Sequence, residues 1–167
     1  MTDKNGEPVK TVEINISSQT LTLKSGGRTI KTYSVSTAKN GPGEKQDSEC
    51  TPRGKHTIAE KIGAGCRPNT VFVGRQPTGE LFSSELRQQF PDRDWIITRI
   101  LWLQGCEPGF NRDGDVDTYR RCIYIHGAPD DVPMGRPGSR GCIRMRNTDI
   151  IELFDLTQTG MEINIYA

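Results

Sequence analysis

The sequence of 167 residues lacks the features that mark membrane, exported and nucleic-acid-binding proteins. It has no run of about 18 apolar residues, so no segment is predicted to span a bilayer. Residues 1–10 carry charges but not the apolar stretch of a secretory signal. Lys and Arg number 22 against 21 Asp and Glu, and this balance gives no reason to expect a nucleic-acid or membrane partner. We expect a cytoplasmic protein; the alternative is a periplasmic protein whose export signal has been removed.

Closely spaced metal-binding residues are also absent. The five cysteines form no C-x-x-C pair and their number is odd, which favours reduced thiols. Neither the cysteines nor the two histidines have the spacing of a zinc site. The acidic turn at 111–117 resembles a calcium loop, but Val116 stands where that loop needs glycine and Cys122 where it needs a bidentate acid. We therefore predict no metal and no cofactor.

The apolar residues that are present fall in short runs between turn-forming residues. Hydrophobic residues make up only 33% of the chain, and 18 glycines and 10 prolines separate the runs. The length suits one domain, and neither a repeat nor a linker divides it. We predict a mainly β fold, a mixed sandwich or barrel with one or two short helices, in which residues 1–10 are a tail and residues 11–167 the domain.

The positions of the runs predict the individual elements. Alternating apolar residues, or continuous β-branched ones, predict strands within 11–23 (two strands and a tight turn), 29–37, 56–62, 71–73, 95–103, 122–125 and 161–166. The polar segments 38–54 and 105–121 are predicted to be loops. A helical turn or two is expected at 83–90, and a short helix after Asn147, which can cap it.

One stretch carries the residues suited to catalysis. Within 123–145, His126 and Cys142 lie on either side of a loop rich in glycine and proline. A nucleophilic cysteine needs a base to remove its proton and backbone N–H groups to hold the oxyanion that forms on attack. His126 is the available base, and the segment before Cys142 can supply the N–H groups. Arg140 and Arg144 would lower the thiol pKa or hold a substrate carboxylate.

The other cysteines and the other histidine have simpler explanations. Most cysteines in proteins are small buried hydrophobic residues, and we predict this for all four of the others. His56 is predicted to be a surface residue of a strand rather than a wall of the cleft. The four cysteines concerned are Cys50, Cys66, Cys106 and Cys122.

The catalytic stretch resembles the active-site signature of the L,D-transpeptidase (YkuD-like) catalytic domain. The resemblance rests on His126-Gly127 and on Ser139-Arg140-Gly141-Cys142-Ile143-Arg144-Met145. One position departs from the family, because Arg140 stands where histidine is common, and this leaves His126 as the one histidine of the motif. Further matches occur along nearly the whole chain, at Gln19-Thr20-Leu21, Ser36-Thr37, Thr51-Pro52-Arg53-Gly54, Asn147, Asp149 and Gly160.

The resemblance implies a β-rich cysteine acyltransferase that acts on murein stem peptides. Such enzymes attack the carbonyl at the L-centre of the third residue and release the terminal D-alanine. By motif position, Cys142 would be the nucleophile, His126 the base, and the backbone of Gly127 would orient the imidazole. The N–H groups of Gly141 and Cys142 would form the oxyanion hole. Substrate contacts would come from Ser139, Arg140 and Arg144.

Three functions remain open for this protein. A cytoplasmic protein has water as acceptor, so we expect an L,D-carboxypeptidase that trims murein tetrapeptides or muropeptides in peptidoglycan recycling. The alternatives are an exported L,D-transpeptidase that forms 3-3 crosslinks and a stem-peptide-binding module without turnover. The sequence leaves the oligomeric state open, and segments 38–54 and 63–93 are the candidates for covering the cleft.

Overall fold

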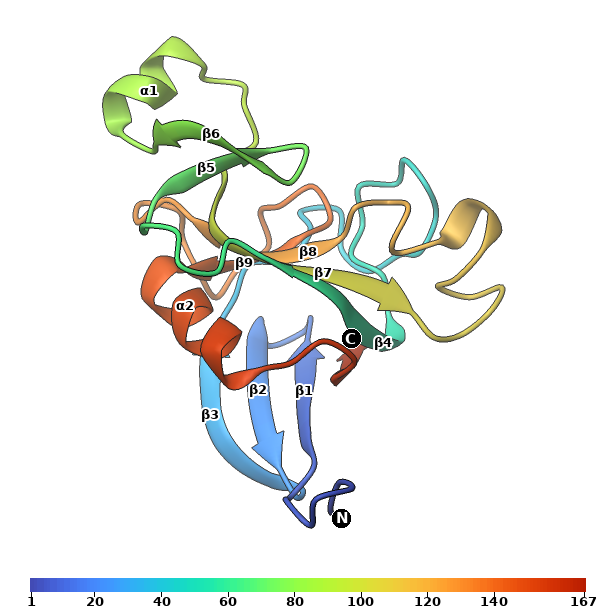
Figure 1. Cartoon of the computed structure of the whole chain (residues 1–167). Coiled ribbons are helices and arrows are strands. Elements are labelled where there is room, and N and C mark those ends of the chain that lie inside the picture. The colour runs from blue at the N-terminus through green and yellow to red at the C-terminus, as the bar shows by residue number, and fades with distance from the viewer.

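The apolar runs form the strands of one ten-stranded sheet in the computed structural model, which describes residues 1–167 (Figure 1). Strands and isolated β-bridges together account for 43% of the chain and helices for 11%, so the fold is mainly β as predicted. The strands are β1 Lys10–Asn15, β2 Thr20–Ser25, β3 Arg28–Ser34, β4 Gly54–Ile62, β5 Thr70–Val73, β6 Gln76–Leu81, β7 Ile96–Gly105, β8 Tyr124–Ala128, β9 Ile143–Arg146 and β10 Glu162–Tyr166. The helices are α1 Ser84–Gln89, α2 Asn147–Leu156 and a 3-10 turn, Gly114–Val116.

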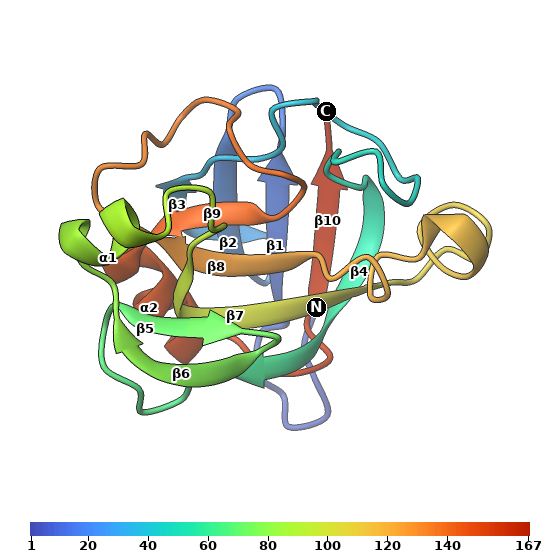
Figure 2. The same ribbon diagram turned by 90° about the horizontal axis from the view of Figure 1, so that it is seen from above.

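The strand order is β3-β2-β1-β10-β4-β7-β5-β6; off this path, β8 pairs with β7, and β9 pairs with β8. Seen from above, β1, β2 and β10 run across the direction of β7, β8 and β9, so the sheet curls around its own interior (Figure 2). The most apolar run forms β7, which pairs with β4, β5 and β8. A buried strand with three neighbours explains why this run lacks alternation.

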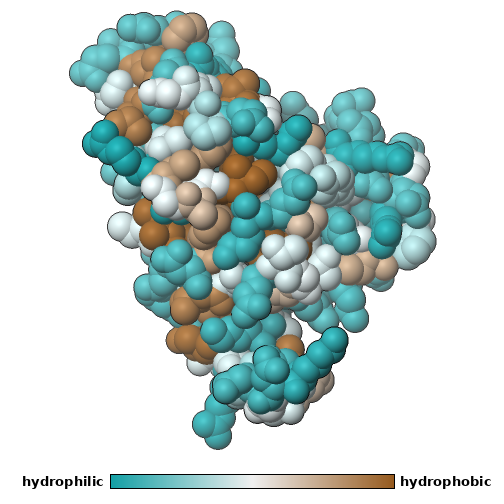
Figure 3. Space-filling view, in the orientation of Figure 1, coloured by the Kyte–Doolittle hydropathy of each residue, from teal (hydrophilic) through white to brown (hydrophobic).

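The main core lies between the two arms of the curled sheet. Alternate residues of β1 and β2 point into it, as the period of two along a strand requires. Helix α2 closes one side with its buried residues Ile150, Leu153 and Phe154. The surface shows hydrophobic residues in small groups between hydrophilic ones (Figure 3). Neither helix has the length and apolar character needed to cross a membrane.

Most of the predicted elements are present with ends shifted by a few residues. The strands predicted within 11–23, 29–37, 56–62, 71–73, 95–103 and 161–166 and the turns of helix at 83–90 are confirmed. Segment 38–53 is irregular, as predicted. Two strands were not predicted: β6 is mostly exposed and lacks an apolar pattern, and β9 is only four residues long. The division into a tail and a domain at residue 10 remains a prediction.

Two local predictions were wrong. Cys122 is not part of a core strand: it is half-buried, precedes β8 and has a φ of 58°. Its left-handed backbone turns the chain into the strand. Asn147 does not cap α2, which begins after Arg146 without a side-chain cap. The amide of Asn147 is instead used in contacts with two distant residues, Asn69 and Thr98.

Candidate active site

Two parallel strands bring the predicted nucleophile and base together. In the pairing of β8 with β9, Ile125 faces Ile143 and His126 faces Arg144. The isoleucines point into the main core, so the alternate residues point to the opposite face. Cys142 directly precedes β9 and therefore lies on the same face as His126, beside Tyr124.

The thiol of Cys142 is held by the backbone of the neighbouring segment. Its sulfur accepts the N–H of Tyr124 at 3.3 Å, and it donates to the carbonyl of Cys122 at 3.4 Å. Burial raises the pKa of Cys142 to about 12, and the opposing influences of the Tyr124 N–H and the Arg144 charge are smaller. The thiol is therefore protonated at neutral pH. The charge of Arg144 lowers the pKa of Cys142 as expected, but burial outweighs it and the net shift of the pKa is upward.

His126 is completely buried and has one free nitrogen. Its Nδ1 lies 2.7 Å from the carbonyl oxygen of Gly127. A carbonyl only accepts hydrogen bonds, so Nδ1 carries the proton and Nε2 carries the lone pair. Nε2 has no hydrogen-bond partner within the chain. Burial lowers the pKa of His126, with the Asp94 charge acting against it, so the free imidazole is a neutral acceptor at neutral pH.

The loop before Cys142 has a fixed shape. The Ser139 hydroxyl donates to the carbonyl of Cys142 at 2.5 Å and accepts the N–H of Gly141 at 3.1 Å. Ser139 is buried and its hydroxyl shapes the loop, and its contact with substrate stays a prediction. The N–H of Cys142 has no partner in the chain and can receive an oxyanion. The N–H of Gly141 would have to share its bond with Ser139.

Gly141 can only be glycine in this loop. Its φ is 132°, and a Cβ there would lie 3.2 Å from the carbonyl oxygen of Cys50. The hydroxyl of Thr51 also donates to the Gly141 carbonyl at 2.9 Å. Segment 38–53 is therefore attached directly to the catalytic loop.

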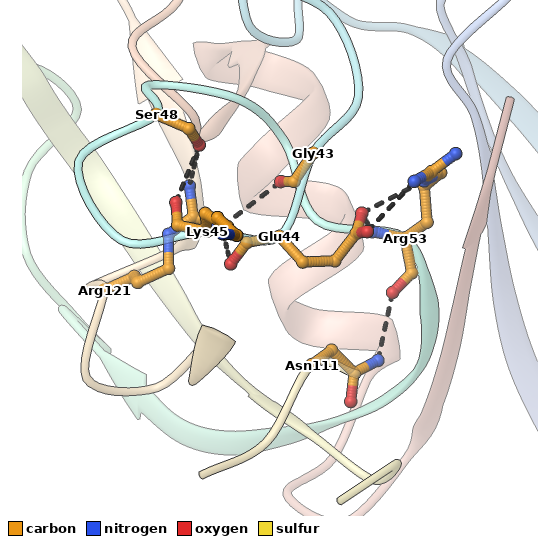
Figure 4. A network of polar contacts seen from close by, with 7 residues as sticks. All are labelled: Gly43, Glu44, Lys45, Ser48, Arg53, Asn111 and Arg121. Carbon is orange, nitrogen blue, oxygen red and sulfur yellow. Dashed lines mark hydrogen bonds and ion pairs between the residues drawn. The ribbon is translucent and has the colours of Figure 1, made fainter. Parts of the chain in front are cut away.

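Arg121 holds segment 38–53 in place from below (Figure 4). Its guanidinium donates to the carbonyls of Glu44 and Cys50 at 3.0 and 2.7 Å, with longer bonds to Gly43 and Ser48. Glu44 also forms an ion pair with Arg53 at 2.9 Å. One half-buried cation that donates to several carbonyls gives this long loop a defined shape.

The second candidate covering segment is attached on the other side of the site. Arg144 forms an ion pair with Asp94 at 3.1 Å, and Arg140 reaches the carbonyl of Asp92 at 3.5 Å. Arg87 of α1 pairs with Asp131. Segments 38–53 and 82–94 thus flank the catalytic loop, and both sequence candidates for covering the cleft lie there.

Two cavities meet at Arg144. One has a volume of about 320 Å³ and includes Ser36, Arg87, Asp131, Arg136 and Arg144 in its wall. The other has about 160 Å³ and is bounded by Asp92, Asp94, Trp95, Arg140 and Arg144. Both cavities therefore present guanidinium groups, among them that of Arg144, which pairs with His126 across β8 and β9. The predicted substrate contacts of Arg140 and Arg144 stay predictions.

The other histidine, His56, was wrongly predicted to lie at the surface. It is completely buried in β4, between β10 and β7. Its Nδ1 donates to the carbonyl of Gly54 at 3.0 Å, and its Nε2 lies 2.9 Å from the Thr118 hydroxyl. Burial lowers the pKa of His56 from 6.5 to about 4. Both nitrogens are used, so His56 is a structural residue.

We expect His56 to make the protein less stable in mild acid. The unfolded chain binds a proton on His56 at a higher pH than the folded protein does, so stability falls as the pH drops from 6.5 toward about 4. The loss is of the order of 3 kcal/mol. Urea denaturation at pH 7 and pH 4.5 measures it. His56→Gln should reduce the difference between the two pH values, and an unchanged difference would assign it to other groups.

A group of polar residues lies beside Gly127, and two of its three members were not singled out by sequence patterns. Asn69, Thr98 and Asn147 are far apart in sequence and hydrogen-bonded to one another. A Cβ on Gly127 would lie 2.6 Å from Asn147 Oδ1 and 2.9 Å from Thr98 Cβ. No local pattern marks Asn69 or Thr98, because their contacts arise only when β5 and α2 meet β7.

Comparison with known proteins gives matches in both sequence and fold. The family model of the L,D-transpeptidase catalytic domain, YkuD, matches residues 9–165. The putative L,D-transpeptidase YkuD of Bacillus subtilis (strain 168) is 23% identical over 154 residues, which are 92% of this chain and 64% of that protein.

Solved structures show the same fold. An L,D-transpeptidase from Xylanimonas cellulosilytica DSM 15894 superposes with a TM-score of 0.57 at 20% identity, covering 99% of this chain and 63% of that one. An L,D-transpeptidase from Mycobacterium smegmatis gives 0.58 at 20% identity, covering 96% and 59%. The chain thus spans about three fifths of the length of these relatives. Because the family model covers almost all of its residues, the chain belongs to the L,D-transpeptidase catalytic domain family.

Proposed function

We propose that this protein is a cysteine acyltransferase that cleaves murein stem tetrapeptides through a thioester on Cys142. The observation that carries the proposal is His126, whose proton is fixed on Nδ1 and whose buried Nε2 is free on the face that carries Cys142. A neutral base beside a protonated thiol suits proton transfer during attack. His126 Nε2 and the sulfur are not hydrogen-bonded here, so the thiol must rotate away from the Cys122 carbonyl to react.

The proposed reaction proceeds in two steps. His126 Nε2 takes the thiol proton as the sulfur bonds to the carbonyl carbon at the L-centre of residue 3, and the Cys142 N–H holds the resulting oxyanion. The C–N bond then breaks, the imidazolium returns the proton to the leaving amine, and D-alanine departs. Water, deprotonated by His126, finally attacks the thioester and releases the tripeptide and the thiol.

The charges around the cleft suit a substrate with several carboxylates. Arg136, Arg140 and Arg144 line the two cavities, and guanidinium groups bind carboxylates in paired hydrogen bonds. Arg144 forms an ion pair with Asp94, so we propose that Arg144 both orders the loop and contacts the substrate. Stem peptides offer such carboxylates at their C-terminus and on their side chains.

Water is the acceptor that we propose, because a cytoplasmic protein would not meet the polymerised murein whose amines serve in crosslinking. A cavity of about 320 Å³ is at the lower end of the range for small-ligand sites, which suits one extended peptide. The loops on both sides are anchored by hydrogen bonds and ion pairs. We accordingly propose L,D-carboxypeptidase activity on muropeptide fragments in peptidoglycan recycling and a cytoplasmic location, which fractionation of cells would test.

Crosslinking is the second candidate, favoured by membership of a family named for transpeptidases. The two are separated by incubating the protein with a disaccharide-tetrapeptide and analysing the products by mass spectrometry. We expect tripeptide and free D-alanine. A dominant crosslinked dimer would show that an amine is the acceptor. Binding without any product, unchanged in Cys142→Ala, would instead indicate a stem-peptide-binding module.

A further inference from the structure

Three residues from different parts of the chain form a closed ring of hydrogen bonds behind His126. The Thr98 hydroxyl donates to Asn147 Oδ1 at 2.6 Å. The Asn147 amide donates to Asn69 Oδ1 at 2.9 Å. The backbone N–H of Asn69 donates to the Thr98 hydroxyl oxygen at 3.0 Å and completes the ring. Thr98 is fully buried and Asn147 nearly so, and each polar atom of the ring has a partner within it.

The ring holds a backbone conformation that is unfavourable by itself. Thr98 has a φ of 76°, in the left-handed region that β-branched residues rarely adopt. It lies where the pairing of β7 with β8 shifts register between Ile97 and Ile100. Buried Arg99 adds a hydrogen bond to the Thr98 carbonyl at 2.7 Å. Strained residues persist only where their surroundings hold them, and bulges of this kind often aim a functional group.

The ring contacts the residue that orients the base. Ile97 pairs with Gly127, and a Cβ on Gly127 would lie 2.6 Å from both the Ile97 carbonyl oxygen and Asn147 Oδ1. Gly127 is therefore enclosed between β7 and Asn147 and cannot shift without moving the ring. Its carbonyl accepts the Nδ1 proton of His126.

We infer that Asn69, Thr98 and Asn147 are positioning residues, which fix the Gly127 carbonyl and thereby the tautomer and orientation of His126. The inference rests on the proposed function, in which His126 is the base. None of the three residues touches the substrate or the sulfur. They act through Gly127 alone, so their removal should slow the chemical step and leave binding unchanged.

The test compares two variants of Thr98. Thr98→Val keeps the shape of the side chain but removes the hydroxyl, whereas Thr98→Ser keeps the hydroxyl. Acylation of Cys142 by imipenem is followed by intact mass over a range of reagent concentrations. We expect Thr98→Val to lower the limiting acylation rate roughly 10- to 100-fold, since small displacements of a catalytic group have effects of this size. The half-saturating concentration should stay within about twofold of wild type, and Thr98→Ser should restore most of the rate.

Thr118→Val is the matched control. Thr118 is also fully buried and its hydroxyl bonds to a histidine, His56, but it has no contact with Gly127. This variant should lose stability and keep the acylation rate below its melting temperature. If Thr98→Val does not fold, Asn69→Gly takes its place, because glycine accepts the φ of 71° at this position while removing the partner of Asn147.

A second readout does not depend on catalysis. In protein labelled with ¹⁵N-histidine, the Nδ1–H resonance of His126 should shift or broaden in Thr98→Val, while that of His56 stays in place. Thr118→Val should show the reverse. An unchanged His126 resonance together with an unchanged acylation rate in Thr98→Val would overturn the inference. Failure of the wild-type protein to acylate would count against the proposed function, and the resonances alone would then decide the role of the ring.

Discussion

His126→Gln should lower the rate of Cys142 acylation by imipenem at pH 7 by about 10²- to 10⁴-fold, the usual contribution of a general base. The reason is that Cys142 has a pKa of about 12 in the free protein, so almost no thiolate exists without a base to remove the proton. A β-lactam such as imipenem is a suitable probe, because its strained amide is an acyl donor that requires a nucleophile and an oxyanion hole.

The pH dependence of the acylation rate tests the role of His126 as base most directly. The wild-type rate should level off once His126 is neutral, which its lowered pKa places in the acidic range. In His126→Gln the rate should instead rise about tenfold for each pH unit between about pH 7 and pH 10, because only hydroxide then makes thiolate. Cys142→Ala should show no adduct at any pH. A flat profile in His126→Gln would mean that another group removes the proton.

Gly127→Ala is expected to have the second-largest effect. The added methyl group would meet the Ile97 carbonyl oxygen and Asn147 Oδ1, both at 2.6 Å, so the strand must move. Overpacking of this kind typically costs about 1–3 kcal/mol of stability. The displaced carbonyl would no longer hold the Nδ1 proton of His126, and a shift near 1 Å can slow catalysis roughly 10²-fold. Thermal melts and imipenem acylation measure the two effects separately.

Gly105→Ala separates damage to the fold from damage to the site. A Cβ on Gly105 would lie 2.1 Å from the Asn111 carbonyl oxygen, a clash at least as severe, but its neighbours are residues of the loop at Asn111. We expect it to lower the melting temperature while the folded fraction still acylates. Equal loss of acylation in both variants would point to general destabilisation instead of a displaced His126.

The sequence determined the elements whose patterns are local. Alternation in 11–23 predicted β1 and β2, and the β-branched run at 95–103 predicted β7. Both patterns depend only on residues that are neighbours in the sequence. The pair His126 and Cys142 was identifiable for a similar reason, since a histidine, a glycine-rich loop and a cysteine occur in one short stretch. The short strand β9 and the exposed strand β6 have no such pattern and were missed.

Only the tertiary structure decided the relative placement and the protonation states of Cys142 and His126. The pairing of β8 with β9 puts Cys142 and His126 on one face, and burial on that face makes the thiol and the imidazole neutral, against the expectation from the neighbouring arginines. His56, which the sequence predicted at the surface, is also buried. The ring of Asn69, Thr98 and Asn147 spans 78 residues of sequence. Desolvation and long-range hydrogen bonds depend on which segments meet, and no local pattern of residues records that.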